Sequence, residues 1–111
     1  MVWFFGWVAV LLLGAALAAF WEEIKEWANE IIEDIKSYAQ KALVYVQRIP
    51  GAVKEFVYYF VNGKVRVKET TKDRPLTNDE IDKMVDRGFL TREQGENMKR
   101  DNEVECGRWN N

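Results

Sequence analysis

Apolar residues fill the start of the chain without interruption. Residues 2–20 contain no charged side chain, and Glu22 and Glu23 follow directly. This run has the length of about 20 apolar residues that a helix needs to cross the hydrocarbon core of a bilayer. Aromatic residues stand at both of its ends, as in the interfacial belts of membrane helices. The pattern predicts a transmembrane helix over residues 2–20.

Two other interpretations of this run stay open. A cleaved signal peptide would use the small residues at 16–18, although no Lys or Arg precedes the apolar stretch as signal peptides require. A buried core helix would need a partner large enough to surround it, and the rest of the chain offers none of that size.

Small residues four positions apart within the run would let two membrane helices approach closely. They form two overlapping pairs, made by Gly14, Ala15, Ala18 and Ala19. Lys residues follow the run and none precedes it, which favours the cytoplasm for the C-terminal part. We therefore expect a single-pass protein of the cell membrane whose C-terminal part is cytoplasmic.

Beyond residue 20 the apolar positions recur every three or four residues as far as Pro50-Gly51. That spacing is the a/d row of an amphipathic helix, and it predicts a juxtamembrane helix over residues 21–49. The candidate interaction row consists of Ile24, Ala28, Ile31, Ile35, Tyr38, Ala42, Tyr45 and Ile49. The rest of the chain, a second copy or another helical protein could cover this row. Adhesion to the bilayer surface is disfavoured, because the opposite face is acidic in its first half.

A hairpin is predicted by "EFVYYFVNGKVRVKET", in which Asn62-Gly63 separates two β-rich runs. Pairing outwards from this turn sorts the side chains into two faces. The apolar face, which we expect to be covered, holds Phe56, Tyr58, Phe60, Val65 and Val67. The other face holds Val57, Tyr59 and Val61 together with a candidate basic surface made by Lys64, Arg66 and Lys68. A helix over residues 52–61 is the alternative to this hairpin region at 52–70.

Two short helices are predicted near the C-terminus. Thr77 with Glu80, and Thr91 with Gln94, have the spacing of helix capping boxes. Gly88 stands where the first of these helices would end. These signals define a helical hairpin over residues 77–101, between a linker at 71–76 and a tail at 102–111.

The stretch "EIDKMVDRGFLTREQGENMKR", residues 80–100, resembles the SHOCT short C-terminal domain. The resemblance lies in a helix, then Gly with an apolar residue, then "LT" capping a second helix with Glu and Lys. It implies an oligomerisation or docking module of the kind appended to membrane-associated bacterial proteins. It implies no catalysis.

The composition excludes several kinds of site. The chain contains no His and one Cys, Cys106. A disulfide within the chain, a Cys/His metal site within one copy and a His-activated nucleophile therefore lack the residues that build them. No Gly-rich phosphate loop and no calcium-loop spacing occurs in the sequence. We expect no enzymatic activity, no cofactor, no metal and no small-molecule substrate.

Charge is unevenly distributed, although the formal net charge is only −2. Residues 36–75 are basic, and acidic segments precede and follow them. Such a layout suits self-complementary contacts or a phosphate group. We expect no nucleic-acid partner, because Tyr58 and Tyr59 beside these cations only loosely resemble a base-stacking platform.

Together these patterns predict a mainly α protein with one β-hairpin, in which a single N-terminal transmembrane helix continues into a long amphipathic helix. We expect a non-enzymatic, membrane-anchored interaction or assembly protein, either a homo-oligomer or a small subunit of a membrane complex. Its partners would be membrane lipid and itself or another membrane protein. A holin-like or pore-forming protein, and a small structural protein of a virion membrane or organellar complex, remain as alternatives.

Overall fold

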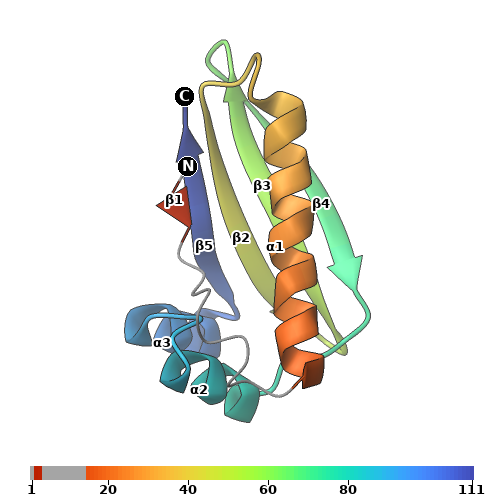
Figure 1. The fold of residues 1–111 in the computed structure, drawn as a ribbon, viewed down its shortest axis with the longest axis vertical. Helices are drawn as coiled ribbons and strands as arrows, with labels where there is room; N and C mark the ends of the chain where they lie inside the picture. Colours follow the sequence, from red (N-terminus) through yellow and green to blue (C-terminus); the bar gives the residue numbers. More distant parts are fainter. Residues whose placement is uncertain (1, 4–14) are drawn as a thin grey trace.

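An antiparallel sheet with a long helix against one face dominates the computed structural model, which describes residues 2–3 and 15–111 (Figure 1). Two short helices lie at one end of the sheet, near the start of the long helix (Figure 1). The helices are α1 (Ala15–Ile35), α2 (Asn78–Asp86) and α3 (Arg92–Asp101). The strands are β1 (Val2–Trp3), β2 (Lys41–Ile49), β3 (Ala52–Val61), β4 (Lys64–Lys72) and β5 (Glu103–Asn110).

The strands lie in the order β1-β5-β2-β3-β4, and every neighbouring pair is antiparallel. Tight turns connect β2 to β3 and β3 to β4, whereas the C-terminal strand β5 pairs with the other edge of β2. The fold is therefore α+β. The prediction of a mainly α protein with one hairpin is wrong, because β2, β5 and the short β1 extend the predicted hairpin into a sheet.

The helix predicted over residues 21–49 ends at Ile35. The last part of that segment forms β2, where Ala42, Val44 and Val46 are buried and the residues between them are half-buried. This stretch fits the heptad spacing and a two-residue alternation equally well. Its β-branched residues and its pairing with β3 along its whole length favour the strand.

The hairpin predicted at Asn62-Gly63 is present. Asn62 and Gly63 have φ values of 50° and 77°, as a type I′ turn requires. The register places Tyr59 opposite Arg66, as the alternation predicts. The alternative, a helix over residues 52–61, is wrong, because these residues form β3.

Helix α1 covers the opposite face of the sheet from the one we expected. It packs over Val57 and Tyr59, which are buried, whereas the face with Phe56 and Tyr58 is turned away from it. The buried residues of β2 lie on the same side as Val57, and they are small or β-branched, which lets the helix approach the sheet closely. The continuous apolar surface that α1 needs is therefore on this side.

The transmembrane helix predicted over residues 2–20 is wrong. Val2–Trp3 pairs with β5, and no helix within the described residues is both long and apolar enough to span a bilayer. Leu17, Phe20 and Trp21 are buried in a core shared with α2 and α3. The prediction of a single-pass cell-membrane protein with a cytoplasmic C-terminal part is wrong with it. Residues 4–14 lie outside the described residues.

Both predicted capping boxes are present at the starts of α2 and α3. The Thr77 hydroxyl accepts a hydrogen bond from the Glu80 N–H, and the Thr91 hydroxyl accepts one from the Gln94 N–H. The Glu80 and Gln94 side chains in turn accept from the N–H groups of the two capping residues. Each box satisfies backbone donors that a helix start would otherwise leave without partners.

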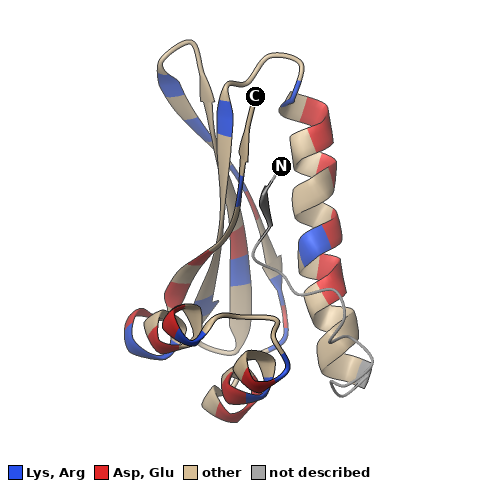
Figure 2. Ribbon diagram, turned by 60° about the vertical axis from the view of Figure 1, so that its left-hand side comes forward, with Lys and Arg blue, Asp and Glu red and all other residues tan. Residues whose placement is uncertain are grey.

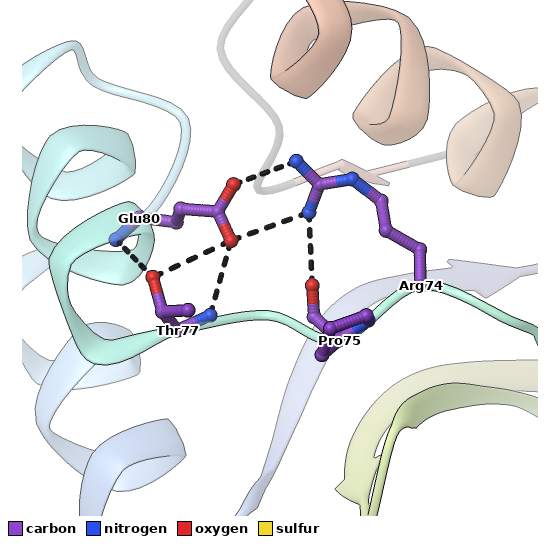
Figure 3. Close-up of polar contacts among 4 residues, drawn as sticks. All are labelled: Arg74, Pro75, Thr77 and Glu80. Atoms are coloured by element: carbon purple, nitrogen blue, oxygen red, sulfur yellow. Dashed lines mark hydrogen bonds and ion pairs between the residues drawn. The ribbon is translucent and has the colours of Figure 1, made fainter.

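Arg74 joins the linker to α2, as Figure 3 shows, and also contacts α1. Its guanidinium forms a bidentate ion pair with Glu80, with Nη2–Oε2 2.6 Å, and donates to the Pro75 carbonyl. Its Cζ lies 4.8 Å from the centroid of the Phe20 ring. Partial burial acts to raise the pKa of Glu80, but hydrogen bonds from Arg74 and the Thr77 N–H outweigh it, so that the pKa is lowered.

Arg48 holds the two short helices against the end of β2. Its Nη1 donates to the Leu76 carbonyl and to the Asn78 Oδ1, and its Nη2 donates to the Met98 carbonyl. Its backbone N–H also donates to the Asn102 carbonyl, 2.6 Å away. One side chain thus joins the linker, α2 and α3 to the sheet.

Candidate interaction surface

The face of the sheet turned away from α1 carries a cluster of apolar and aromatic side chains, which we call the open face. Figure 2 shows α1 on one side of the sheet, and α2 and α3 at one end of the sheet. The apolar residues of the open face are Leu43, Tyr45, Phe56, Tyr58, Phe60, Val65 and Val67. Within the described residues, no helix packs over this cluster.

Aromatic rings meet at the centre of the open face. The rings of Tyr45 and Tyr58 lie edge to face, with centroids 5.5 Å apart, and those of Phe56 and Tyr58 are stacked at 5.9 Å. These contacts leave the rings half-buried, while Val65 and Val67 on the outer strand are 58% and 49% exposed. A shallow hollow lies among Leu43, Tyr45, Tyr58, Phe60, Val65 and Glu103.

The register of the strands arranges the open face in four rows. From the Asn62-Gly63 end, each row reads across β5, β2, β3 and β4. The rows are Asn110-Lys41-Phe60-Val65, Arg108-Leu43-Tyr58-Val67, Glu105-Tyr45-Phe56-Glu69 and Glu103-Gln47-Lys54-Thr71. The apolar residues therefore form one block. Lys41 lies in the first row and Glu103 and Lys54 in the last, while Arg108, Glu105 and Glu69 flank the block on β5 and β4 in the two middle rows.

The end of the open face near Asn62-Gly63 is basic. Lys41 lies with its Nζ 5.6 Å from the centroid of the Phe60 ring, which is within the range of a cation–π contact. Arg108 lies in the next row and pairs with Glu105, with Nη2–Oε2 2.9 Å. We call Lys41 and Arg108 the basic end.

The opposite end of the open face is acidic. Glu69, Glu103 and Glu105 outnumber Lys54, which lies 3.7 Å from Glu69. Burial and then the charges of Glu105 and Glu103 raise the pKa of Tyr45 beside them. We call the three Glu residues the acidic end. The open face as a whole carries equal numbers of basic and acidic side chains.

A β-bulge in β5 sets which of its side chains reach the open face. Val44 pairs with Gly107 and Tyr45 pairs with Glu105, so that Cys106 has no residue opposite it on β2. The extra residue shifts the alternation by one position. Glu105 and Arg108 therefore lie on the open face together, although they are three residues apart.

Buried polar groups gather on the other side of the sheet, under α1. Glu55 is fully buried, and neither of its carboxylate oxygens has a hydrogen-bond partner among the described residues. Burial raises its pKa to about 9, against the opposing charge of Lys72. Burial, followed by the charges of Glu55 and Glu105, also raises the pKa of the Cys106 thiol. The thiol is thus kept protonated and away from solvent, which disfavours nucleophilic chemistry.

The candidate interaction row of the sequence is divided among three elements. Its first four members lie on the inner side of α1 and are buried against the sheet: Ile24, Ala28, Ile31 and Ile35. Tyr38 is exposed in the turn after α1, Ala42 is buried on β2, Tyr45 lies on the open face and Ile49 ends β2. The rest of the chain therefore covers the helical part of the row.

The other candidate residues are also placed apart. Of the residues predicted to pack between membrane helices, Ala15 begins α1, Ala18 is buried and Ala19 is exposed, while Gly14 lies outside the described residues. The candidate basic surface is exposed on the outer strand β4, on the side of the sheet that faces α1: Lys64, Arg66 and Lys68.

Two strands of the open face were missed because residues 41–49 were assigned to a helix and residues 103–110 to a tail. A two-residue alternation in β2 would place Leu43 and Tyr45 beside Tyr58, but the heptad spacing fits the same residues equally well. The bulge at Cys106 leaves no comparable pattern in the sequence, because it depends on pairing with a distant strand.

Among residues 2–3 and 15–111, no group of three or more His, Cys, Asp or Glu side chains is placed to hold a metal ion. No protein-family model, curated protein or solved structure matches the chain. The resemblance of residues 80–100 to the SHOCT domain stays a prediction. Function has to be inferred from the surfaces themselves.

Proposed function

We propose that this chain is a non-enzymatic assembly protein whose open face binds the same face of a second copy. The observation that carries the proposal is the aromatic cluster on a sheet face that α1 leaves uncovered. Single apolar residues on a protein surface are ordinary, but a contiguous apolar patch of several hundred Å² is typical of a binding surface.

The charges around the cluster support a second copy as the occupant. A two-fold axis that lies between the two faces and runs across the strands would reverse the strand direction of one copy relative to the other. The half of each copy with Lys41 and Arg108 would then lie over the half of its partner with Glu69, Glu103 and Glu105, and the Arg108–Glu105 ion pair within one copy would lie beside the same pair of the other. A nucleic acid is disfavoured at the same place, because Glu69, Glu103 and Glu105 would repel its phosphates.

The size of the open face supports a weak and reversible dimer. Four strands about 4.8 Å apart and four rows about 7 Å apart give a flat area of roughly 500 Å². Two such faces would bury roughly 1,000 Å² in total, which is the lower end for specific interfaces. We therefore expect a dissociation constant in the micromolar range, with the two sheets packed about 10 Å apart as in a β-sandwich.

Val67→Lys tests this proposal. Val67 is 49% exposed and lies beside Tyr58, so that a Lys here can reach solvent in a monomer but would be buried between two copies. Tyr38→Lys is the matched control, since Tyr38 is 48% exposed but lies in the turn after α1. Sedimentation over a concentration series is expected to show dimers for wild type and Tyr38→Lys and monomers for Val67→Lys. A wild type that stays monomeric, or a Val67→Lys variant that dimerises like wild type, would refute the proposal.

A further inference from the structure

A second surface lies along the outer edge of the sheet. Strand β4 is the last strand in the order and pairs only with β3 among the described strands. In an antiparallel pair, alternate residues of each strand direct their N–H and C=O groups away from the partner strand. β4 therefore offers a row of backbone donors and acceptors to an additional strand over its nine residues, Lys64–Lys72.

The side chains in the first half of β4, residues 64–68, are sorted by charge along this edge. Lys64, Arg66 and Lys68 are exposed on the side that faces α1, and none of them has an ion-pair partner among the described residues. Lys72 continues the row, with its Nζ 4.0 Å from Glu23 of α1. The alternate residues, Val65 and Val67, lie on the open face. Over residues 64–68 the edge thus presents cations on one side and β-branched apolar residues on the other, and Glu69 and Thr71 follow on the open face.

This pattern of side chains determines which kinds of strand could pair with the β4 edge. Two copies of β4 paired with each other would set Lys and Arg side chains opposite one another, and like charges directly opposite across strands are destabilising. Edge lysines are a common protection against such pairing. A strand with acidic residues at every second position would instead meet a cation at each of these positions.

We propose that the β4 edge binds an extended acidic segment of a partner protein by strand addition. The segment adds to the sheet beside β4, and main-chain hydrogen bonds supply the affinity, as in other cases of strand addition. Its acidic side chains lie beside Lys64, Arg66 and Lys68. Its alternate residues are β-branched or apolar and lie beside Val65 and Val67. The recognised pattern is therefore Glu or Asp alternating with Val, Ile or Thr over five to seven residues.

The test uses a fluorescent heptapeptide in which Glu alternates with Val and Thr, titrated with the full chain and followed by anisotropy. The double variant Arg66→Glu/Lys68→Glu is expected to weaken binding roughly tenfold or more, because two cross-strand ion pairs become like-charge pairs. The control Lys83→Glu/Arg87→Glu makes the same change of net charge at exposed positions on and just after α2 and is expected to bind like wild type.

Two further peptides separate strand addition from simple charge attraction. A peptide of the same composition with all Glu residues in one block, and one N-methylated at alternate backbone nitrogens, are both expected to lose binding. Equal binding of either peptide, or of a single-stranded oligonucleotide, would overturn the proposal in favour of nonspecific attraction. Absence of binding by the alternating peptide would also overturn the proposal. The lysines would then serve only to protect an unpaired edge strand from pairing with other strands.

Discussion

The buried carboxyl group of Glu55 gives a prediction whose size follows from the structure. Glu55 lies on β3 between Val46 of β2 and Thr70 of β4, under α1. Its pKa is raised from 4.5 to about 9, mainly by burial, so that the folded state holds the group as a neutral acid at neutral pH. The unfolded chain exposes the same group to water and releases its proton near the ordinary pKa.

The sign of the effect on stability follows from proton binding. Between pH 4.5 and about 9 the folded state binds one proton more than the unfolded state at this site. The free energy of unfolding therefore falls by about 1.4 kcal/mol per pH unit as the pH rises through this window. The stabilisation that comes from the proton on Glu55 is complete below pH 4.5. About 3 kcal/mol of it is lost by pH 7.

Glu55→Gln removes the ionisable group and keeps the shape of the side chain. We expect the variant to be more stable than wild type by about 3 kcal/mol at pH 7, with a larger difference at pH 8 and nearly none at pH 4.5. Urea unfolding followed by circular dichroism at several pH values measures this difference. Glu26→Gln, at an exposed position of α1, is the control and is expected to follow the wild-type curve. Parallel curves for wild type and Glu55→Gln would show that the Glu55 carboxyl does not titrate as the structure implies.

Two further predictions concern the α2–α3 hairpin. A Cβ at Gly95 would approach the Val85 Cγ2 closer than van der Waals contact allows, so that Gly95→Ala is expected to destabilise the fold by about 1–3 kcal/mol. Adding Val85→Ala should recover part of the loss in urea unfolding, and an undiminished loss in the double variant would contradict the steric reason. Glu80→Gln is expected to cost about 1 kcal/mol above pH 4.5, because the ion pair with Arg74 weakens. The lowered pKa of Glu80 means that this difference should fade as the pH falls below 4.5, and a constant difference down to pH 3 would contradict it.

Local signals in the sequence predicted the parts of the fold that depend on neighbouring residues. Asn62-Gly63 determines its turn and register through backbone conformation alone, and the two capping boxes determine where α2 and α3 begin. Residues 41–49 could not be assigned in the same way. Their apolar positions satisfy two periods, and the strand is selected by pairing with β3 and with the distant β5.

The candidate surface was predicted in part. The alternation of β3 and β4 correctly placed Phe56, Tyr58 and Val67 on one face. The expectation that this face is covered failed, because the choice depends on which side of β2 offers α1 the better packing surface. The transmembrane prediction for the apolar N-terminal run was wrong for a related reason. Leu17 and Phe20 are buried in the core shared with the C-terminal helices, which are distant in the sequence.

The proposed pairing of open faces is tested most directly by a residue-resolved NMR dilution series of the wild-type chain between about 1 μM and 1 mM, which brackets a dissociation constant in the micromolar range. We expect concentration-dependent shifts for the side chains of Leu43, Tyr45, Tyr58 and Val67, and constant shifts for exposed residues of α2. Side-chain shifts on the open face that stay constant over the whole range, or concentration-dependent shifts confined to other surfaces, would contradict the proposal.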